Sequence, residues 1–132
     1  MVTSRPDEPN GQSYGKSGQG FPKSLRVRKR AEFLRIQNEG AKVAVGPLLA
    51  LALRNAGGPT RLGITVSSKV GDAHVRVRIR RRLREIFRKR RSELPPGIDL
   101  VLIARPSAKD ADFDELSAAF GTIARRLRGI FR

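Results

Sequence analysis

Apolar residues recur every three or four positions in three segments of the chain, and this spacing predicts three helices. The first runs from Arg28 to Glu39 and precedes Gly40, a residue type that often ends helices. The second starts after Asp72, a good N-cap residue, and its apolar stripe consists of Val75, Ile79, Leu83 and Ile86. The third has acidic residues at its start and a stripe formed by Phe113, Leu116, Phe120, Ile123, Leu127 and Ile130.

Between these helices the apolar residues alternate or run together, as in β-strands. From Arg61 to Lys69, one face would hold Leu62, Ile64 and Val66, and the other Gly63, Thr65 and Ser67. The segment Ile98–Ala104 is apolar on both faces, which indicates a central strand. The run Val43–Leu53 is almost wholly apolar around Gly46-Pro47 and fits a strand pair, a bend or a short helix.

This order predicts one small α/β (α+β) domain, a two-layer-type sandwich in which a small mixed sheet packs with three helices in the order α-β-β-α-β-α. The domain should cover residues 25–132. Residues 1–24 are rich in Gly, Pro and Ser and hold few large apolar side chains. They are predicted to form a disordered tail, because they have too little apolar surface to offset the entropy of ordering.

The positive charge of the chain limits the kinds of partner that the protein is expected to bind. The net charge is +16 over 132 residues, and ten of the sixteen residues from Arg76 to Arg91 are Arg or Lys. Arg76, Arg80, Arg84 and Arg88 would rise as a ladder on the second helix, with Arg78, Arg81 and Arg82 beside it. A disordered basic arm would lack the apolar stripe inside this run. An ordered cationic surface therefore indicates a nucleic-acid partner.

The start of the first helix is also basic, at Arg28, Lys29 and Arg30. A membrane partner is not expected, because the apolar stripe is needed for the core and no apolar run approaches the ~20 residues that span a bilayer. The N-terminus lacks the apolar region of a signal peptide, so the chain is expected to be cytoplasmic.

The sequence has few residues of the types that perform catalysis. The chain has no Cys and one histidine, His74, which fits an RNA-proximal or a solvated side chain. Asp72 and Asp99 are the only carboxylates expected near the strands, and no phosphate-binding glycine motif is present. The sequence thus indicates a binding protein without a catalytic or metal site of its own. The small-residue face of the Arg61–Lys69 strand could face water or allow an extended nucleic-acid strand to approach.

The segment from Arg61 to Arg88, R-L-G-I-T-V-S-S-K-V-G-D-A-H-V-R-V-R-I-R-R-R-L-R-E-I-F-R, resembles the protein component of bacterial ribonuclease P. That family has a strand of the type G-L-x-V-S-K-K-x-G, followed by a helix of the type A-V-x-R-N-R-x-K-R-x-x-R-E. Weaker similarity extends over residues 25–130. The chain departs from the pattern at Val77, where the family usually has Asn, and at Ser68, where Lys is common.

The resemblance implies a non-catalytic subunit of an endoribonuclease, in which ribonuclease P RNA and Mg²⁺ remove the 5′ leader of precursor tRNA. It also implies a left-handed β-α-β crossover and no obligate protein partner. Leader contacts would fall to Phe33, Thr65 and Ser67, beside a cleft between the sheet and the first helix. RNA contacts would fall to Arg76, Arg78, Arg80, Arg81, Arg84, Arg88, Lys69, Arg28, Lys29 and Arg30.

Two other interpretations stay open at this point. A ribosomal or assembly-type RNA-binding protein would have the same charge without a substrate contact. A sequence-nonspecific DNA-binding protein would have it as well.

Overall fold

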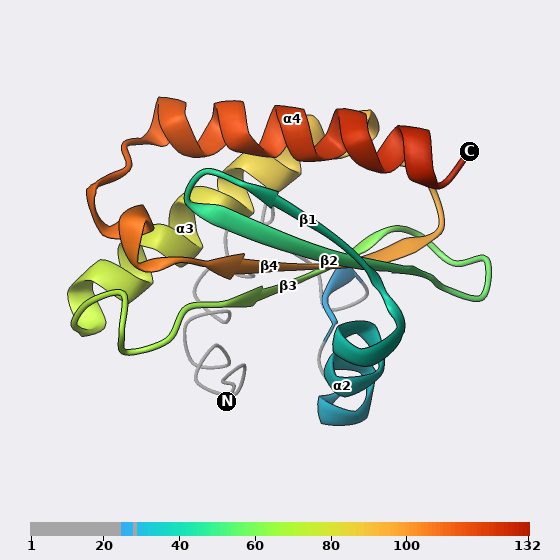
Figure 1. Ribbon diagram of the computed structural model, residues 1–132, viewed down its shortest axis with the longest axis horizontal. Coiled ribbons are helices and arrows are strands. Elements are labelled where there is room, and N and C mark those ends of the chain that lie inside the picture. The colour runs from blue at the N-terminus through green and yellow to red at the C-terminus, as the bar shows by residue number, and fades with distance from the viewer. Residues whose placement is uncertain (1–24, 28) are drawn as a thin grey trace.

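The computed structural model describes residues 25–27 and 29–132, which form a four-stranded mixed sheet and three α-helices (Figure 1). The predicted 1–24 tail and the predicted RNA contact Arg28 lie outside the described residues. The elements, in chain order, are α2 (Arg30–Glu39), β1 (Ala41–Val45), β2 (Leu48–Arg54), β3 (Arg61–Thr65), α3 (Ala73–Arg90), β4 (Ile98–Ala104) and α4 (Phe113–Ile130), with short 3-10 turns η2 (Arg91–Glu93) and η3 (Pro106–Asp110).

The segment whose pattern fitted several structures, Val43–Leu53, forms a strand pair. β1 and β2 are antiparallel neighbours, with Val45 opposite Leu48 across a two-residue turn. Gly46 has φ +53° in that turn, a conformation that glycine adopts without a steric cost. The domain therefore has the order α-β-β-β-α-β-α, one strand more than the predicted order.

The sheet has the strand order β1-β2-β4-β3. β2 pairs antiparallel with β4, whereas β3 pairs parallel with β4 and reaches it through α3. The central position predicted for Ile98–Ala104 is confirmed, because β4 has a partner on both sides. The left-handed sense of the β3-α3-β4 crossover stays an expectation from the resemblance.

Helices lie on both faces of the sheet (Figure 1). α3 and α4 cover one face, where the main core includes Leu48, Leu100 and Leu102 from the strands, Leu83 and Phe87 from α3, and Phe120 and Ile123 from α4. α2 covers part of the opposite face and adds a partial third layer to the predicted sandwich. Its Phe33 and Ile36 form a second core with Val27, Leu51 and Val101.

Two glycines let α2 approach the sheet closely. A Cβ atom at Gly63 would lie 2.8 Å from the ring of Phe33, and one at Gly40 would lie 2.7 Å from the carbonyl oxygen of Ala52. Gly40 has an extended backbone, so its role is this close approach and not a left-handed helix end. Side chains at either position would push α2 away from the strands.

An ion-pair network also holds α2 to the sheet. Arg61 on β3 donates two hydrogen bonds to Asp99 on β4, at 2.8 and 2.7 Å, and a third to Glu32 on α2 at 3.1 Å. The hydrogen bonds that Arg61 donates to Asp99 raise the pKa of Arg61 above its usual value. Burial lowers this pKa, but by less. Arg61 thus keeps its charge throughout the accessible pH range.

Capping hydrogen bonds confirm the predicted starts of α3 and α4. Asp72 Oδ1 accepts a hydrogen bond from the Val75 amide at 3.1 Å. Asp112 and Glu115 form a reciprocal capping box, with N–O distances of 2.8 and 3.0 Å. α2 begins at Arg30, two residues later than predicted, with Lys29 as its N-cap.

Candidate RNA interface

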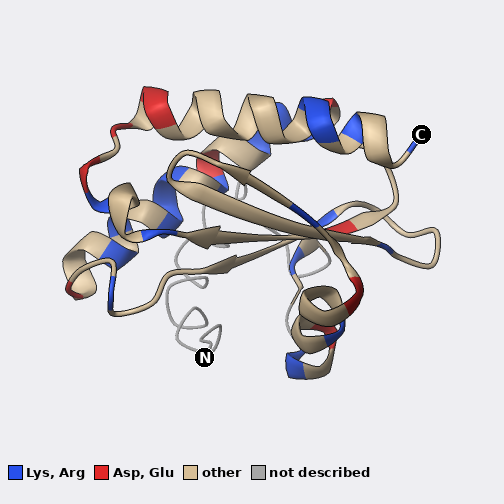
Figure 2. Ribbon diagram, viewed as in Figure 1, with Lys and Arg blue, Asp and Glu red and all other residues tan. Residues whose placement is uncertain are grey.

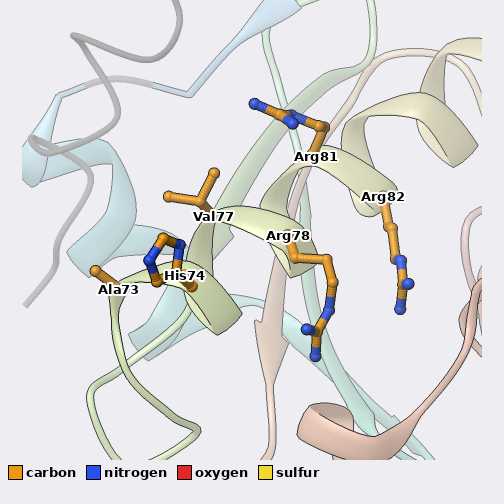
Figure 3. Close-up of a pocket in the computed structure, with 6 residues that line it drawn as sticks. All are labelled: Ala73, His74, Val77, Arg78, Arg81 and Arg82. Atoms are coloured by element: carbon orange, nitrogen blue, oxygen red, sulfur yellow. The ribbon is translucent and has the colours of Figure 1, made fainter.

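The first turns of α3 form a cationic surface around an open hollow of about 520 Å³ (Figure 3). Its lining comes from one face of the helix: Ala73, His74, Val77, Arg78, Arg81 and Arg82. In Figure 3 the Arg81 side chain extends to one side of the helix and those of Arg78 and Arg82 extend to the other, so a phosphate chain that crosses this face meets positive charge on both sides. The sequence pattern had pointed to the arginines but not to the hollow.

Neighbouring backbone orients several of these cations. Arg78 donates to the carbonyl of Lys109 at 3.1 Å, and Arg82 donates to the carbonyl of Ala111 at 3.1 Å. Arg76 donates to the carbonyl of Gly71 at 2.9 Å. Carbonyl oxygens carry no net charge, so these bonds fix the guanidinium groups without neutralising them. Such preordered cations lose less side-chain entropy when they bind a phosphate.

The predicted ladder is not an evenly exposed surface. Arg80 and Arg84 are each only 6% exposed, in contrast to the expectation that they face outward with Arg76 and Arg88. The reason is that Phe87 joins the core and widens the apolar stripe. Arg80 lies two turns before Phe87 and Arg84 lies one turn before it, so both arginines fall at the border of the stripe.

At the end of α3 the charges are partly paired. Glu85 accepts from Arg88 at 2.7 Å and lies 3.3 Å from Lys89. The hydrogen bond from Arg88, and then that from Lys89, lowers the pKa of Glu85. Arg88 remains exposed enough to meet solvent, but its charge is offset by this acid. Glu85 is the only acid of α3, so this pairing affects the second half of the helix.

A second candidate surface lies on the sheet face next to α2. The pairing places Ala44, Leu49, Ile103 and Thr65 in one row across all four strands. In the neighbouring row, Leu51, Val101 and Gly63 are buried on the α2 side of the sheet, and Lys42 at the other end is exposed. In the first row Ala44 is exposed and the other three residues are half-buried. We call this row the open sheet face; the sequence identified only its Thr65.

Phe33, to which the resemblance assigns a leader contact, is not an exposed aromatic ring. Its side chain is 8% exposed and packs over Gly63 and against Val27 in the second core. Phe33 instead lies buried between α2 and the sheet, next to the open sheet face. A contact between Phe33 and the leader stays a prediction, but stacking of a base on its flat face would require that core to open.

The remaining predicted residues flank these surfaces. β3 ends at Thr65, earlier than the predicted Lys69, because the chain turns: the amides of Val70 and Lys69 donate to the carbonyl and hydroxyl of Ser67. Ser67 and Lys69 are exposed on this turn, between the open sheet face and the start of α3. Lys29 and Arg30 are exposed at the start of α2.

The two carboxylates considered for catalysis have structural partners. Asp72 caps α3, and Asp99 is bound by Arg61 and Asn55. Within residues 25–27 and 29–132, no group of three or more His, Asp or Glu side chains is placed to hold a metal ion. Over the same part of the chain, no helix is long and apolar enough to cross a membrane.

Comparison with known proteins gives matches to one family. The family model described as Ribonuclease P matches residues 21–128. The ribonuclease P protein component of Gluconacetobacter diazotrophicus is 46% identical over 105 residues, covering 78% of this chain and 88% of the relative. That of Citrifermentans bemidjiense is 41% identical over 110 residues, covering 80% and 94%.

Solved structures agree with the sequence comparison. The RNase P protein of Thermotoga maritima superimposes with a TM-score of 0.71 at 32% identity, covering 76% of this chain and 96% of that one. The RNase P protein of Staphylococcus aureus gives a TM-score of 0.71 at 31% identity, covering 83% and 100%. With this match over nearly the whole described fold, the chain belongs to the ribonuclease P protein family.

Proposed function

We propose that this protein, as the subunit that works with ribonuclease P RNA in an endoribonuclease complex, binds that RNA through α3 and the 5′ leader of precursor tRNA on the open sheet face. The observation that carries the proposal is the continuity of the two surfaces. The open sheet face ends at Thr65, the exposed turn with Ser67 and Lys69 follows, and α3 begins at Ala73.

The α3 surface suits a folded RNA. Arg78, Arg81 and Arg82 surround one hollow, and the carbonyl bonds of Arg78 and Arg82 hold two of them in place. A rigid helix that presents several oriented guanidinium groups matches the fixed phosphate positions of a structured RNA. Among the residues that the structure describes, the lining of this hollow includes no carboxylate that would repel phosphate.

The open sheet face suits a single strand. Neighbouring strands lie about 4.8 Å apart, so the row from Leu49 to Thr65 is about 10 Å wide. It is bounded on one side by α2, and its half-buried apolar side chains can contact unstacked bases. Lys69 and Ser67, at the end of the row, supply one charge and one hydroxyl for the backbone.

We further propose that ribonuclease P RNA with bound Mg²⁺ performs the hydrolysis, while the protein positions the substrate. The support is the chemistry of the described side chains. The carboxylates nearest the sheet and α3, at Asp72, Asp99 and Glu85, are engaged in a helix cap or in ion pairs with arginines. Positioning alone is a substantial contribution, because alignment of reactants lowers the entropic part of a barrier.

The test is reconstitution with purified ribonuclease P RNA. Protein alone should leave precursor tRNA intact with Mg²⁺, and protein plus RNA should cleave at the 5′ end of the mature tRNA. The double variant Arg78→Gln/Arg81→Gln should weaken binding to the RNA. Leu49→Glu, on the open sheet face, should weaken binding of precursor tRNA to the complex while leaving mature tRNA binding unchanged. Cleavage by protein free of RNA would contradict the assignment of hydrolysis to the RNA.

Recovery of bound nucleic acid from cells separates the alternatives. Ribonuclease P RNA with precursor tRNA supports the proposal. Ribosomal RNA or DNA as the main bound species would favour an assembly protein or a DNA-binding protein instead.

A further inference from the structure

Arginines also gather at the C-terminal end of α4, away from the α3 hollow. Arg125, Arg126 and Arg128 come from the second half of α4, and Arg54 comes from the end of β2. In Figure 2 the positive residues of α4 lie in its C-terminal half and the acidic ones at its start. We call these four residues the α4 arginine cluster.

The helix dipole does not explain the whole cluster. Cations stabilise a helix C-terminus, but the effect is confined to the last turn. α4 ends at Ile130, so Arg125 and Arg126 lie before that turn. Arg54 is on a strand, yet its guanidinium sits 5.4 Å from the ring centre of Phe131 and donates to a main-chain oxygen of Arg132, the last residue of the sequence. The fold therefore draws a fourth cation to the end of the helix.

The charges of this cluster are available to a partner. Arg125 and Arg126 are exposed, and neither has a hydrogen bond or ion pair within residues 25–27 and 29–132. Glu93 is the nearby acid, and both of its carboxylate oxygens accept from Arg90 at 2.9 Å. Arg128 donates to the Glu93 carbonyl, and its charge makes a small contribution, after the hydrogen bond from Arg90, to the lowered pKa of the Glu93 carboxyl group.

We propose that the α4 arginine cluster is a second RNA-binding surface, which contacts the phosphate backbone of ribonuclease P RNA at a segment distinct from the one on α3. The identity of this RNA rests on the proposed function. Guanidinium groups form charge-assisted, often bidentate hydrogen bonds with phosphate oxygens, and such backbone contacts position a protein on a nucleic acid. The ring near the cluster, Phe131, is half-buried beneath Arg54.

The position of the cluster favours the large RNA over the precursor leader. α4 packs on the sheet face opposite to α2 and the open sheet face (Figure 1). A helix of 18 residues is about 27 Å long, so the cluster lies far from the start of α4, where Arg78 and Arg82 are anchored. A partner must be large to reach both sites, and a folded RNA meets this requirement.

The first test removes two charges. Arg125→Gln/Arg126→Gln should lower the affinity for ribonuclease P RNA roughly tenfold at about 0.15 M salt, and the log–log salt slope should fall by about 1.5. The control for net charge is Arg35→Gln/Lys42→Gln, which removes two exposed positive charges on the other side of the sheet, one of them in an exposed ion pair between Arg35 and Glu39. Binding is measured without precursor tRNA. Equal losses in the two variants would overturn the proposal, because net charge alone would then explain them.

The second test locates the RNA. The chain has no Cys, so an introduced cysteine can carry a single iron chelate for hydroxyl-radical cleavage. A Cβ at Gly129 meets no atom within 4 Å, which makes Gly129→Cys a suitable site beside the cluster. Ser107→Cys, exposed on η3 near the anchor of Arg78, probes the α3 surface.

Each result decides a different point. Cleavage of two separate RNA segments from the two positions supports the second surface. Cleavage from Ser107→Cys alone overturns it and leaves the proposed function intact. Cleavage from neither position, in a complex that still forms, overturns both.

Discussion

Substitutions of single residues at the edge of the core are expected to have measurable effects on stability or on RNA binding. Val77 and Phe33 are both apolar side chains of a nucleic-acid-binding domain, but the fold uses them in opposite ways. Val77 lines the cationic hollow beside Arg78 and Arg81 and is not part of either core (Figure 3). Phe33 is part of the second core.

Val77→Asn should therefore change the free energy of unfolding by no more than about 0.5 kcal/mol, as surface substitutions do. The amide gains a possible hydrogen bond to RNA, so binding of ribonuclease P RNA should not weaken. Denaturant unfolding and RNA titration of this variant check both statements. A loss of about 1–3 kcal/mol would mean that an amide is unsatisfied in the core, and that the orientation of α3 is wrong.

Phe33→Ala should destabilise the domain by about 3–5 kcal/mol, because it removes a buried ring and leaves a cavity above Gly63. The melting temperature should fall, and any loss of RNA binding should be similar for precursor and mature tRNA. An unchanged melting temperature with selective loss of precursor binding would instead show that Phe33 contacts the leader directly.

At the scale of elements, α3 depends on its N-cap to present the hollow. The hydrogen bond from the Val75 amide lowers the pKa of Asp72 in the folded protein, with smaller help from His74 and Arg76. A carboxylate with a lowered folded pKa adds stability at pH values above its unfolded pKa. That contribution disappears as the pH falls through the folded pKa.

Asp72→Asn should keep the capping bond, because Asn is also a good N-cap, while removing this titration. The melting temperature of the variant should therefore fall less steeply than that of the natural protein as the pH drops below about 4. Thermal unfolding monitored from pH 6 to pH 2.5 gives the comparison. Parallel curves for the two proteins would show that the Asp72 carboxylate has the same pKa in both states.

At the scale of the whole molecule, the net charge of +16 acts through a limited number of ordered contacts. If about six to eight phosphates are neutralised, the log–log slope of affinity for ribonuclease P RNA against salt should be about −4 to −7. Titrations between about 0.1 and 0.5 M monovalent salt measure it. A slope near zero would mean that neither α3 nor the α4 arginine cluster binds through phosphate contacts.

The sequence by itself determined the three helices, their caps at Asp72 and Asp112, and the cationic first half of α3. These features depend on residues three or four positions apart, so a linear pattern contains them. It also carried the family resemblance, because the strand-to-helix segment from Arg61 to Arg88 is continuous in the chain.

Only the tertiary structure decided what packs against what. It made Val43–Leu53 a strand pair, because β2 pairs with β4, more than forty residues later in the chain. It buried Arg80 and Arg84 beside the stripe that Phe87 widened, and it buried Phe33 over Gly63. It also aligned Leu49, Ile103 and Thr65 in one open row. Each outcome depends on contacts between distant segments, and the exposure of a side chain is fixed by the neighbour that covers it, which no local period records.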